Sequence, residues 1–112
     1  MRYLTVHRER ALACFAMQYD CILNREQTAF VAEHEGRPIE EGLGDWPSLR
    51  NGGTIRIEIG AEVTTFFAVC QTEHKLLCTQ TLTIPAGEEN VNVLVKTEYN
   101  GDRKLSLTAE VV

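Results

Sequence analysis

The feature that most constrains the fold of this chain is a period-two alternation of apolar and polar residues in short segments. In the clearest segment, residues 54–59, three isoleucines alternate with Thr54, Arg56 and Glu58. Successive side chains of a β-strand point to opposite faces, so this alternation is typical of a strand with one buried face. Turn residues separate the segments from one another, which favours an all-β chain.

Alternating or β-branched segments recur along the whole chain. We expect further strands at residues 4–7, 15–23, 28–32, 63–70, 76–84, 91–99 and 104–112. Turns are predicted at residues 24–26, 51–53, 85–90 and 100–102, which are rich in residues that reverse the chain or tolerate positive φ. A helix over residues 8–17 is the competing interpretation. It ranks second because the alternation continues to Leu23.

Seven or eight short strands and no convincing helix predict an antiparallel β-sandwich of two sheets, with an immunoglobulin-like or jelly-roll-like topology. Residues 1–112 form one domain in this prediction, because their number suits one hydrophobic core and no linker or repeat divides them. Acidic residues interrupt the basic ones of the first quarter. We therefore expect a solvated strand face, not a phosphate site, for Arg2, Arg8, Arg10 and Arg25.

Charge and hydropathy bear on the partners and the location of the chain. The 16 acidic and 11 basic residues give a net charge of −5, so no nucleic-acid partner is expected. The longest apolar run, residues 11–17, is far shorter than the ~20 residues of a membrane helix, so no membrane span is expected. Met1 leads directly into alternating residues. We therefore expect a cytoplasmic location, with a removed export signal as the open alternative.

Residues 34–53 lack either period and are predicted to form a long loop, with a short helical turn near Trp46. Long loops in compact domains are often functional. Trp46 could stack on a sugar ring, with polar groups orienting it: Arg37, Asp45 and Arg50. The competing interpretation is that Trp46 closes one end of the sandwich, and that the acidic residues of this loop are simply solvated.

The four cysteines, Cys14, Cys21, Cys70 and Cys78, are expected to be buried and reduced, and no cofactor is expected. The weaker alternative is a metal site at Cys70, His74 and Cys78, completed by the other two thiols, although the spacing is wider than zinc sites use. Catalytic residues are not predicted. A cysteine–histidine nucleophile pair involving His7, His34 or His74 is a further, weaker alternative.

Several stretches carry a resemblance to known domains. They are an Arg-containing strand at residues 4–8, a strand with an Asp/Asn turn at 19–24, a Leu-x-Asn-Gly turn at 49–52 before an Ile strand, and the turn at 84–88. Their order resembles that of small bacterial β-domains of unknown function, and the short strands with Gly turns are similar in style to PEGA-like domains. The resemblance implies a binding or structural module and supplies no catalytic residues.

The sequence therefore predicts a non-catalytic module for protein interaction or self-association, through a sheet edge or through the loop at 34–48. The terminal hairpin could expose such an edge, with Lys96, Arg103 and Lys104 opposing strand addition. A small-ligand or carbohydrate binder using Trp46 is the first alternative. A metal protein or enzyme built on the cysteines and His74 is the second.

Overall fold

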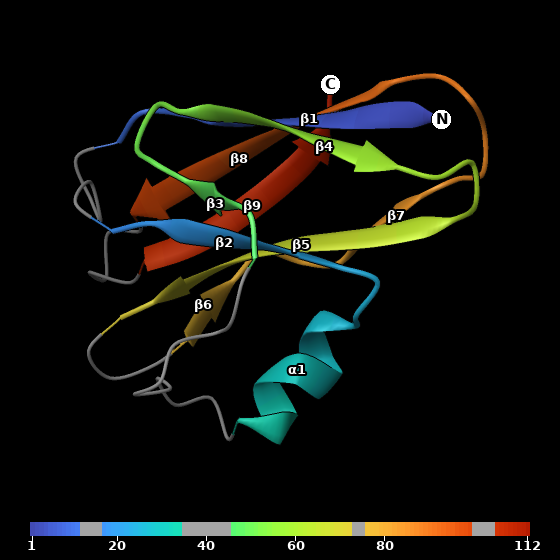
Figure 1. The fold of residues 1–112 in the computed structure, drawn as a ribbon. Coiled ribbons are helices and arrows are strands. Elements are labelled where there is room, and N and C mark those ends of the chain that lie inside the picture. Colours follow the sequence, from blue (N-terminus) through green and yellow to red (C-terminus); the bar gives the residue numbers. More distant parts are fainter. Residues whose placement is uncertain (12–16, 35–45, 73–75, 100–104) are drawn as a thin grey trace.

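The computed structural model describes residues 1–11, 17–34, 46–72, 76–99 and 105–112. Two β-sheets lie face to face, and one short helix packs against the outer face of one sheet (Figure 1). This arrangement confirms the predicted all-β sandwich. Within the described ranges, no helix has both the length and the apolar character needed to cross a bilayer.

The first sheet has the strand order β4-β1-β8-β9. Its strands are β1 (Arg2–Arg8), β4 (Thr54–Ile59), β8 (Val91–Tyr99) and β9 (Leu105–Val111). Strand β1 lies inside the sheet, antiparallel to β4 and parallel to β8. The parallel pair departs from the expected purely antiparallel arrangement. The N-terminal strand β1 thus lies between β4, from the middle of the chain, and β8, from its last quarter.

The second sheet is built around β5 (Thr64–Gln71), its longest strand. On one side β5 pairs with β2 (Tyr19–Leu23), which in turn pairs with β3 (Ser48–Leu49). On the other side β5 pairs in succession with β7 (Leu82–Ile84) and β6 (Leu76–Cys78). The single strand expected over residues 76–84 is thus two strands. Thr79 interrupts the ladder, because its amide donates a hydrogen bond to the Ala68 carbonyl and its hydroxyl accepts one from the Ala68 amide.

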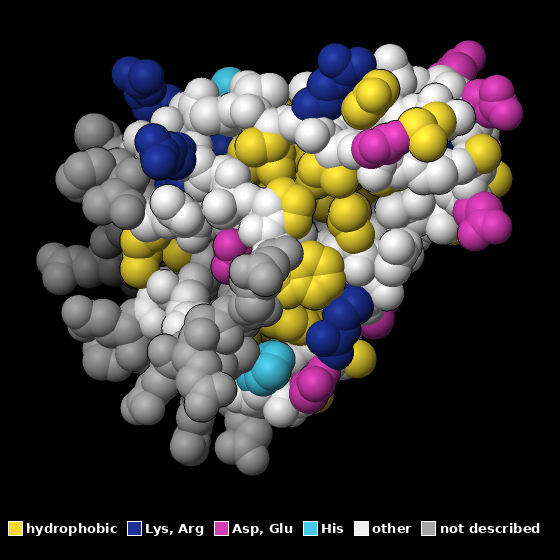
Figure 2. All heavy atoms as spheres, viewed as in Figure 1, with side chains coloured by type: hydrophobic (Ala, Val, Ile, Leu, Met, Phe, Trp, Pro, Cys, Tyr) yellow, Lys and Arg dark blue, Asp and Glu magenta, His cyan; other side chains and the backbone are white. Residues whose placement is uncertain are grey.

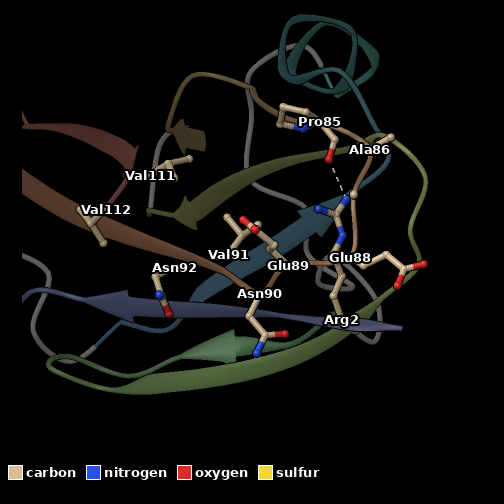
Figure 3. A pocket seen from close by; sticks show the side chains of 11 residues that line it. Arg2, Pro85, Ala86, Glu88, Glu89, Asn90, Val91, Asn92, Val111 and Val112 are labelled. Atoms are coloured by element: carbon tan, nitrogen blue, oxygen red, sulfur yellow. Dashed lines mark hydrogen bonds between the residues drawn. The ribbon is translucent and has the colours of Figure 1, made fainter.

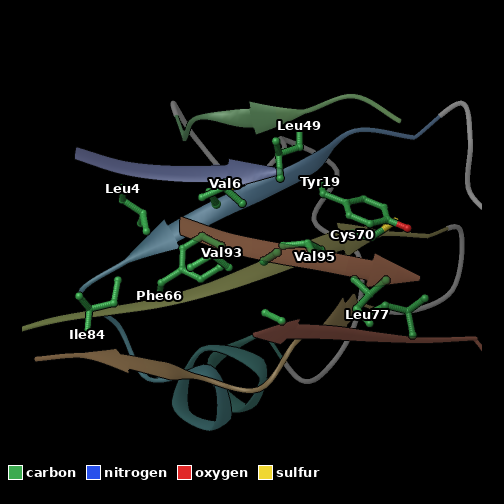
Figure 4. Packing of buried hydrophobic residues seen from close by; sticks show 14 of the residues in the cluster. Leu4, Val6, Tyr19, Leu49, Phe66, Cys70, Leu77, Ile84, Val93 and Val95 are labelled. Carbon is green, nitrogen blue, oxygen red and sulfur yellow. The ribbon is translucent and has the colours of Figure 1, made fainter. Parts of the chain in front are cut away.

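The main hydrophobic core fills the space between the two sheets (Figure 4). The alternation predicts most of its members on β1, β2, β8 and β9, although Val111, in phase with Leu107 and Ala109, is exposed. The inward side chains of β5 are also buried there. Fully buried large side chains of this core include Leu4, Val6, Tyr19, Leu49, Phe66, Ile84 and Val95. Interdigitated apolar side chains of this kind supply most of the free energy that holds two sheets together.

The strand expected at residues 28–32 is wrong, because helix α1 (Gln27–Glu33) occupies that stretch. Phe30 is 2 % exposed and packs edge-on against Phe67 of β5, with ring centroids 5.3 Å apart. It belongs to a second apolar cluster on the outer face of the second sheet, together with Ile22, Phe67, Val69 and Leu76. A helix covers this face because three outward side chains of β2 and β5, those of Ile22, Phe67 and Val69, are apolar and need burial.

Polar contacts fix where α1 begins. The hydroxyl of Thr81, just before β7, accepts a hydrogen bond from the Gln27 amide at 2.9 Å and donates one to the Glu26 carboxylate at 3.2 Å. These contacts satisfy an amide that has no partner inside the helix. Asn24, with a φ of 60°, turns the chain from β2 towards the helix. Gly52 also has positive φ, as the predicted turn at residues 51–53 requires.

The strand expected at residues 15–23 begins later than predicted, because β2 begins at Tyr19. The strand expected at residues 104–112 is described from Leu105, where β9 begins. Residues 12–16 and 100–104 lie outside the described part of the chain. The competing helix over residues 8–17 therefore cannot begin at Arg8, which ends β1. The long segment after α1 contains the short strand β3, and its residues 35–45 also lie outside the described part.

The solvated face expected for the arginines is wrong for Arg2 and Arg8, which are 3 % and 0 % exposed. The guanidinium of Arg8 lies over the ring of Tyr19, 3.5 Å from its centroid. It donates hydrogen bonds to the carbonyl of Met17 at 2.6 Å and to that of Leu49 at 3.1 Å. A side chain of the first sheet thereby holds the segment before β2 and the strand β3 of the second sheet.

Replacing Arg8 by methionine keeps an unbranched chain in the core and leaves the Met17 and Leu49 carbonyls without their donor. We expect the free energy of unfolding to fall by about 2–4 kcal/mol, because bonds to a charged donor are lost from a buried site. Chemical denaturation measures this loss. The matched control is Arg10→Met, at an exposed arginine, where a change within about 0.5 kcal/mol is expected. Equal effects of the two substitutions would contradict the role of Arg8.

Candidate functional site

The residues predicted to bind a ligand are only partly placed by the structure. Trp46 is half-buried against the second cluster, which contains Ile22 and Phe30, so its ring takes part in packing outside the second sheet. Arg50 is exposed just after β3. Arg37 and Asp45 lie outside the described residues. Closure of the end of the sandwich by Trp46 is not what the packing shows, and ligand binding stays a prediction.

The cysteines of the predicted metal site lie on opposite faces of the second sheet. Cys70 is fully buried in the core between the sheets, whereas Cys78 packs with the cluster on the outer face. Their strands are neighbours, but Cys78 is paired with Val69 and not with Cys70. Two ligands of one metal must point to the same side, so this pair is not brought together. His74 and Cys14 lie outside the described residues, among which no group of metal-ligating side chains occurs.

The environment of two described thiols, those of Cys21 and Cys78, also keeps them protonated. Burial raises the pKa of the Cys21 thiol from 9.0 to about 12, with a smaller contribution from the charge of Asp20. Burial likewise raises the pKa of Cys78 to about 11, against a smaller opposing effect of its hydrogen bond with Gln27. A thiol must ionise to act as a nucleophile or metal ligand, so both are inert near neutral pH.

We therefore expect slow thiol modification in the folded chain. In a Cys14→Ser background, labelling of Cys21 and Cys78 with Ellman's reagent at neutral pH should be at least ~100-fold slower in the folded chain than in the unfolded one, because a rise of about two units in pKa removes that much thiolate. The free energy of unfolding should fall as pH rises above 9.0, where the unfolded thiols ionise but Cys21 does not until about pH 12. Equal labelling rates in both states would contradict this account.

A hollow of about 530 Å³ lies beside Arg2, where the turn at residues 85–90 meets the C-terminus (Figure 3). Arg2 donates from Nε to the carbonyl of Gly60 at 3.0 Å, and from Nη2 to those of Glu62 at 3.1 Å and Pro85 at 2.8 Å. Pro85 belongs to the turn that lines the hollow, whereas Gly60 and Glu62 belong to the turn after β4. Arg2 is thus engaged in holding the turns, and Glu88 and Glu89 add negative charge to the rim.

The edges of the two sheets differ in how far they are open to another strand. In the second sheet the edge strands β3, β6 and β7 have two or three residues each, which is too short to template a long pairing. In the first sheet, a side chain occupies the β9 edge at one residue, Ala109. Gln80 donates from Nε2 to the Ala109 carbonyl at 2.7 Å, and its Oε1 accepts from the Ala109 amide at 3.3 Å.

The Gln80 amide occupies the place that a neighbouring strand would take, so its removal should expose the β9 edge. We expect Gln80→Ala to lower the free energy of unfolding by about 1–2 kcal/mol, through loss of the two hydrogen bonds. It should also increase association at high concentration, measured by light scattering. Gln18→Ala, at an exposed glutamine, is the control and should behave like the native chain. Unchanged stability of the Gln80 variant would argue against closure of this edge.

Strand β4 is the remaining edge, and among the described residues it pairs with β1 alone. The amide of Arg8 donates to the carbonyl of Gly53 at 2.9 Å, which fixes the phase of the β1–β4 ladder. Hydrogen-bonded and non-hydrogen-bonded pairs alternate along such a ladder. The isoleucines therefore exchange backbone hydrogen bonds with β1, and the outward backbone groups belong to Thr54, Arg56 and Glu58.

The inward side chains of β4 are less covered than those of its neighbour. Ile55 and Ile57 are half-buried at the margin of the core, whereas Leu4 and Val6 on β1 are fully buried. Apolar side chains gather on this side of the molecule, between β4 and α1 (Figure 2). A second hollow, of about 520 Å³, lies at the end of β4 and is lined by Met1 and residues 58–61.

The outer face of β4 is polar and charged. The Arg56 guanidinium lies 3.9 Å from the ring centroid of Tyr3, and Glu58 is exposed beside it. Nδ1 of His7 lies 2.8 Å from the hydroxyl of Thr54. The β4 edge thus combines outward backbone groups, partly open isoleucines on one face and opposite charges on the other.

The sequence predicts an interaction through a sheet edge or the loop at 34–48, but it does not identify β4 as that edge, although residues 54–59 show the clearest alternation. An alternating strand can lie inside or at the edge of a sheet, and the local pattern does not distinguish the two. Searches of family models, curated proteins and solved structures gave no match to this chain.

Proposed function

We propose that this chain is a non-catalytic interaction module that takes up an extended segment along β4. The observation that carries the proposal is the difference between the edges: β4 has six residues and outward backbone groups, while Gln80 occupies the outward amide and carbonyl of Ala109 within β9. A segment added at an open edge gains main-chain hydrogen bonds, which supply affinity without any particular sequence.

Side chains on the two faces of β4 support specificity in this mode of binding. An incoming strand would place alternate side chains beside Ile55 and Ile57 on the inner face, where apolar area is still exposed. Its remaining side chains would lie beside Arg56 and Glu58 on the outer face. The proposed partner is thus an extended segment that alternates apolar and polar residues, with charges of both signs.

A photo-crosslinking experiment in the source cells tests this proposal. Thr54, exposed at the edge, is replaced by p-benzoylphenylalanine, which should form an adduct with the bound segment on irradiation. The additional substitution Arg56→Pro should abolish the adduct, because proline removes an outward amide and spares the bonds to β1. Mass spectrometry identifies the adducts.

Two controls accompany this experiment. Arg56→Ala removes the charge but keeps the amide, so the adduct should persist. The same photo-crosslinker at Glu110, an exposed position of β9, should give no adduct that depends on Arg56→Pro. Thermal unfolding verifies that each variant folds. No adduct at position 54, or one that Arg56→Pro leaves undiminished, would refute strand uptake at β4.

A further inference from the structure

The sequence of β4 is complementary to itself, and we infer that the segment taken up along β4 is the β4 strand of a second copy of this chain. This inference rests on the proposed function and specifies its partner. The two strands run antiparallel about a two-fold axis at Ile57 and join the two first sheets into one continuous sheet. Such an isologous contact uses the same patch on both copies and closes at a dimer.

The direction of the backbone groups limits the possible registers. Only Thr54, Arg56 and Glu58 direct their amides and carbonyls outward within β4, so hydrogen-bonded pairs across the new contact must join members of this set. A two-fold axis at Arg56 places this arginine opposite its own copy. An axis at Glu58 places two glutamates opposite each other, and an axis at Ile55 pairs Arg56 with Thr54.

Charge selects the fourth register, in which the axis passes through Ile57. Arg56 of each copy then lies opposite Glu58 of the other, so the contact has two pairs of opposite charge and none of like charge. Directly opposite side chains in an antiparallel pair interact, and opposite charges stabilise it while like charges destabilise it. The two pairs also exchange main-chain hydrogen bonds, since both residues are of the outward-bonding set.

The inner face fits the same register. Ile57 lies opposite its own copy, and Ile55 lies opposite Ile59, all as non-hydrogen-bonded pairs, in which side chains approach most closely. Ile55 and Ile57 are half-buried in the single chain, so the contact would cover apolar area that the second sheet leaves open. The hollow lined by Met1 and residues 58–61 adjoins the end of β4, where the first residues of the partner's strand would arrive.

Charge reversals test both the partner and the register, with solution mass measured by size exclusion and light scattering over a wide concentration range. The native chain should form dimers. Each single reversal, Arg56→Glu or Glu58→Arg, turns two attractive pairs into repulsive ones, so the dissociation constant should rise about tenfold or more. The double reversal restores the pairs with their signs exchanged, so its constant should return to within about threefold of native. An equimolar mixture of the two single variants should form heterodimers.

Net charge provides an internal control. From −5, Arg56→Glu changes the net charge by −2 to −7, and Glu58→Arg changes it by +2 to −3. Repulsion between whole chains would therefore weaken association in the first variant and strengthen it in the second, whereas the proposed pairs weaken it in both. Dilute samples are melted in parallel, because Arg56 also lies over Tyr3 within one chain.

An oxidative crosslink tests the axis independently of charge. Ile57→Cys places two thiols opposite each other at the axis, so a disulfide-linked dimer should form readily. Ile55→Cys is the matched control, since its opposite residue is Ile59 and its two copies are apart. The native chain, treated alike, gives the background from its own cysteines.

The outcomes separate this inference from the proposed function. A native chain that remains monomeric at all concentrations overturns the second copy as partner, as does a double reversal that fails to restore association. Equal disulfide formation at positions 55 and 57 overturns the register. In each case, an adduct of another protein at position 54 that Arg56→Pro abolishes would leave strand uptake at β4 intact, and its absence would remove both.

Discussion

The guanidinium of Arg8 is the contact between the two sheets on which the arrangement of the others depends. It comes from the last residue of β1 and reaches the carbonyls of Met17 and Leu49, so the segment before β2 and the strand β3 are held from the opposite sheet. The guanidinium also lies over Tyr19, and Tyr19 in turn contacts β8, because its hydroxyl is 2.6 Å from that of Thr97. A buried charge is tolerated there because Nη1 donates to two carbonyl oxygens and the guanidinium lies over an aromatic face.

The placement of β1 determines which edge of the first sheet is open. Arg2 and Arg8, at the two ends of β1, bind carbonyls on several turns and strands, and this fixes β1 as an interior strand with β8 on one side. Strand β4 is then left at the outside. The opposite edge, β9, lies close enough to the second sheet for Gln80 to reach Ala109. The approach of the sheets therefore lets a side chain occupy the β9 edge at Ala109, whereas the described part of the chain places only β1 beside β4.

Much of the fold follows from the alternation in the sequence, and the exceptions have physical causes. Arg2 and Arg8 alternate in phase with Leu4 and Val6, so their inward direction was visible, but their charge favoured a solvated face. Helix α1 was missed because Phe30 packs against apolar outer side chains of β5, which lie far from it in the sequence. The continuous apolar run at residues 66–70 was its one signal, since a strand buried on both faces needs a covering layer. Strand order, and with it the open edge, depends on contacts between distant residues.

In the proposed pairing, the charges on β4 also explain how an open edge can make one specific contact. A long alternating strand at an edge would pair with many strands if its outer face were uncharged. With Arg56 and Glu58 at adjacent outward positions, registers that align like charges are disfavoured, and partners without complementary charges gain less. The isoleucines supply apolar contacts on the inner face, and the two charges limit the registers in which these contacts can form. The same six residues thus combine the attraction that a binding edge requires with the discrimination that prevents indiscriminate pairing.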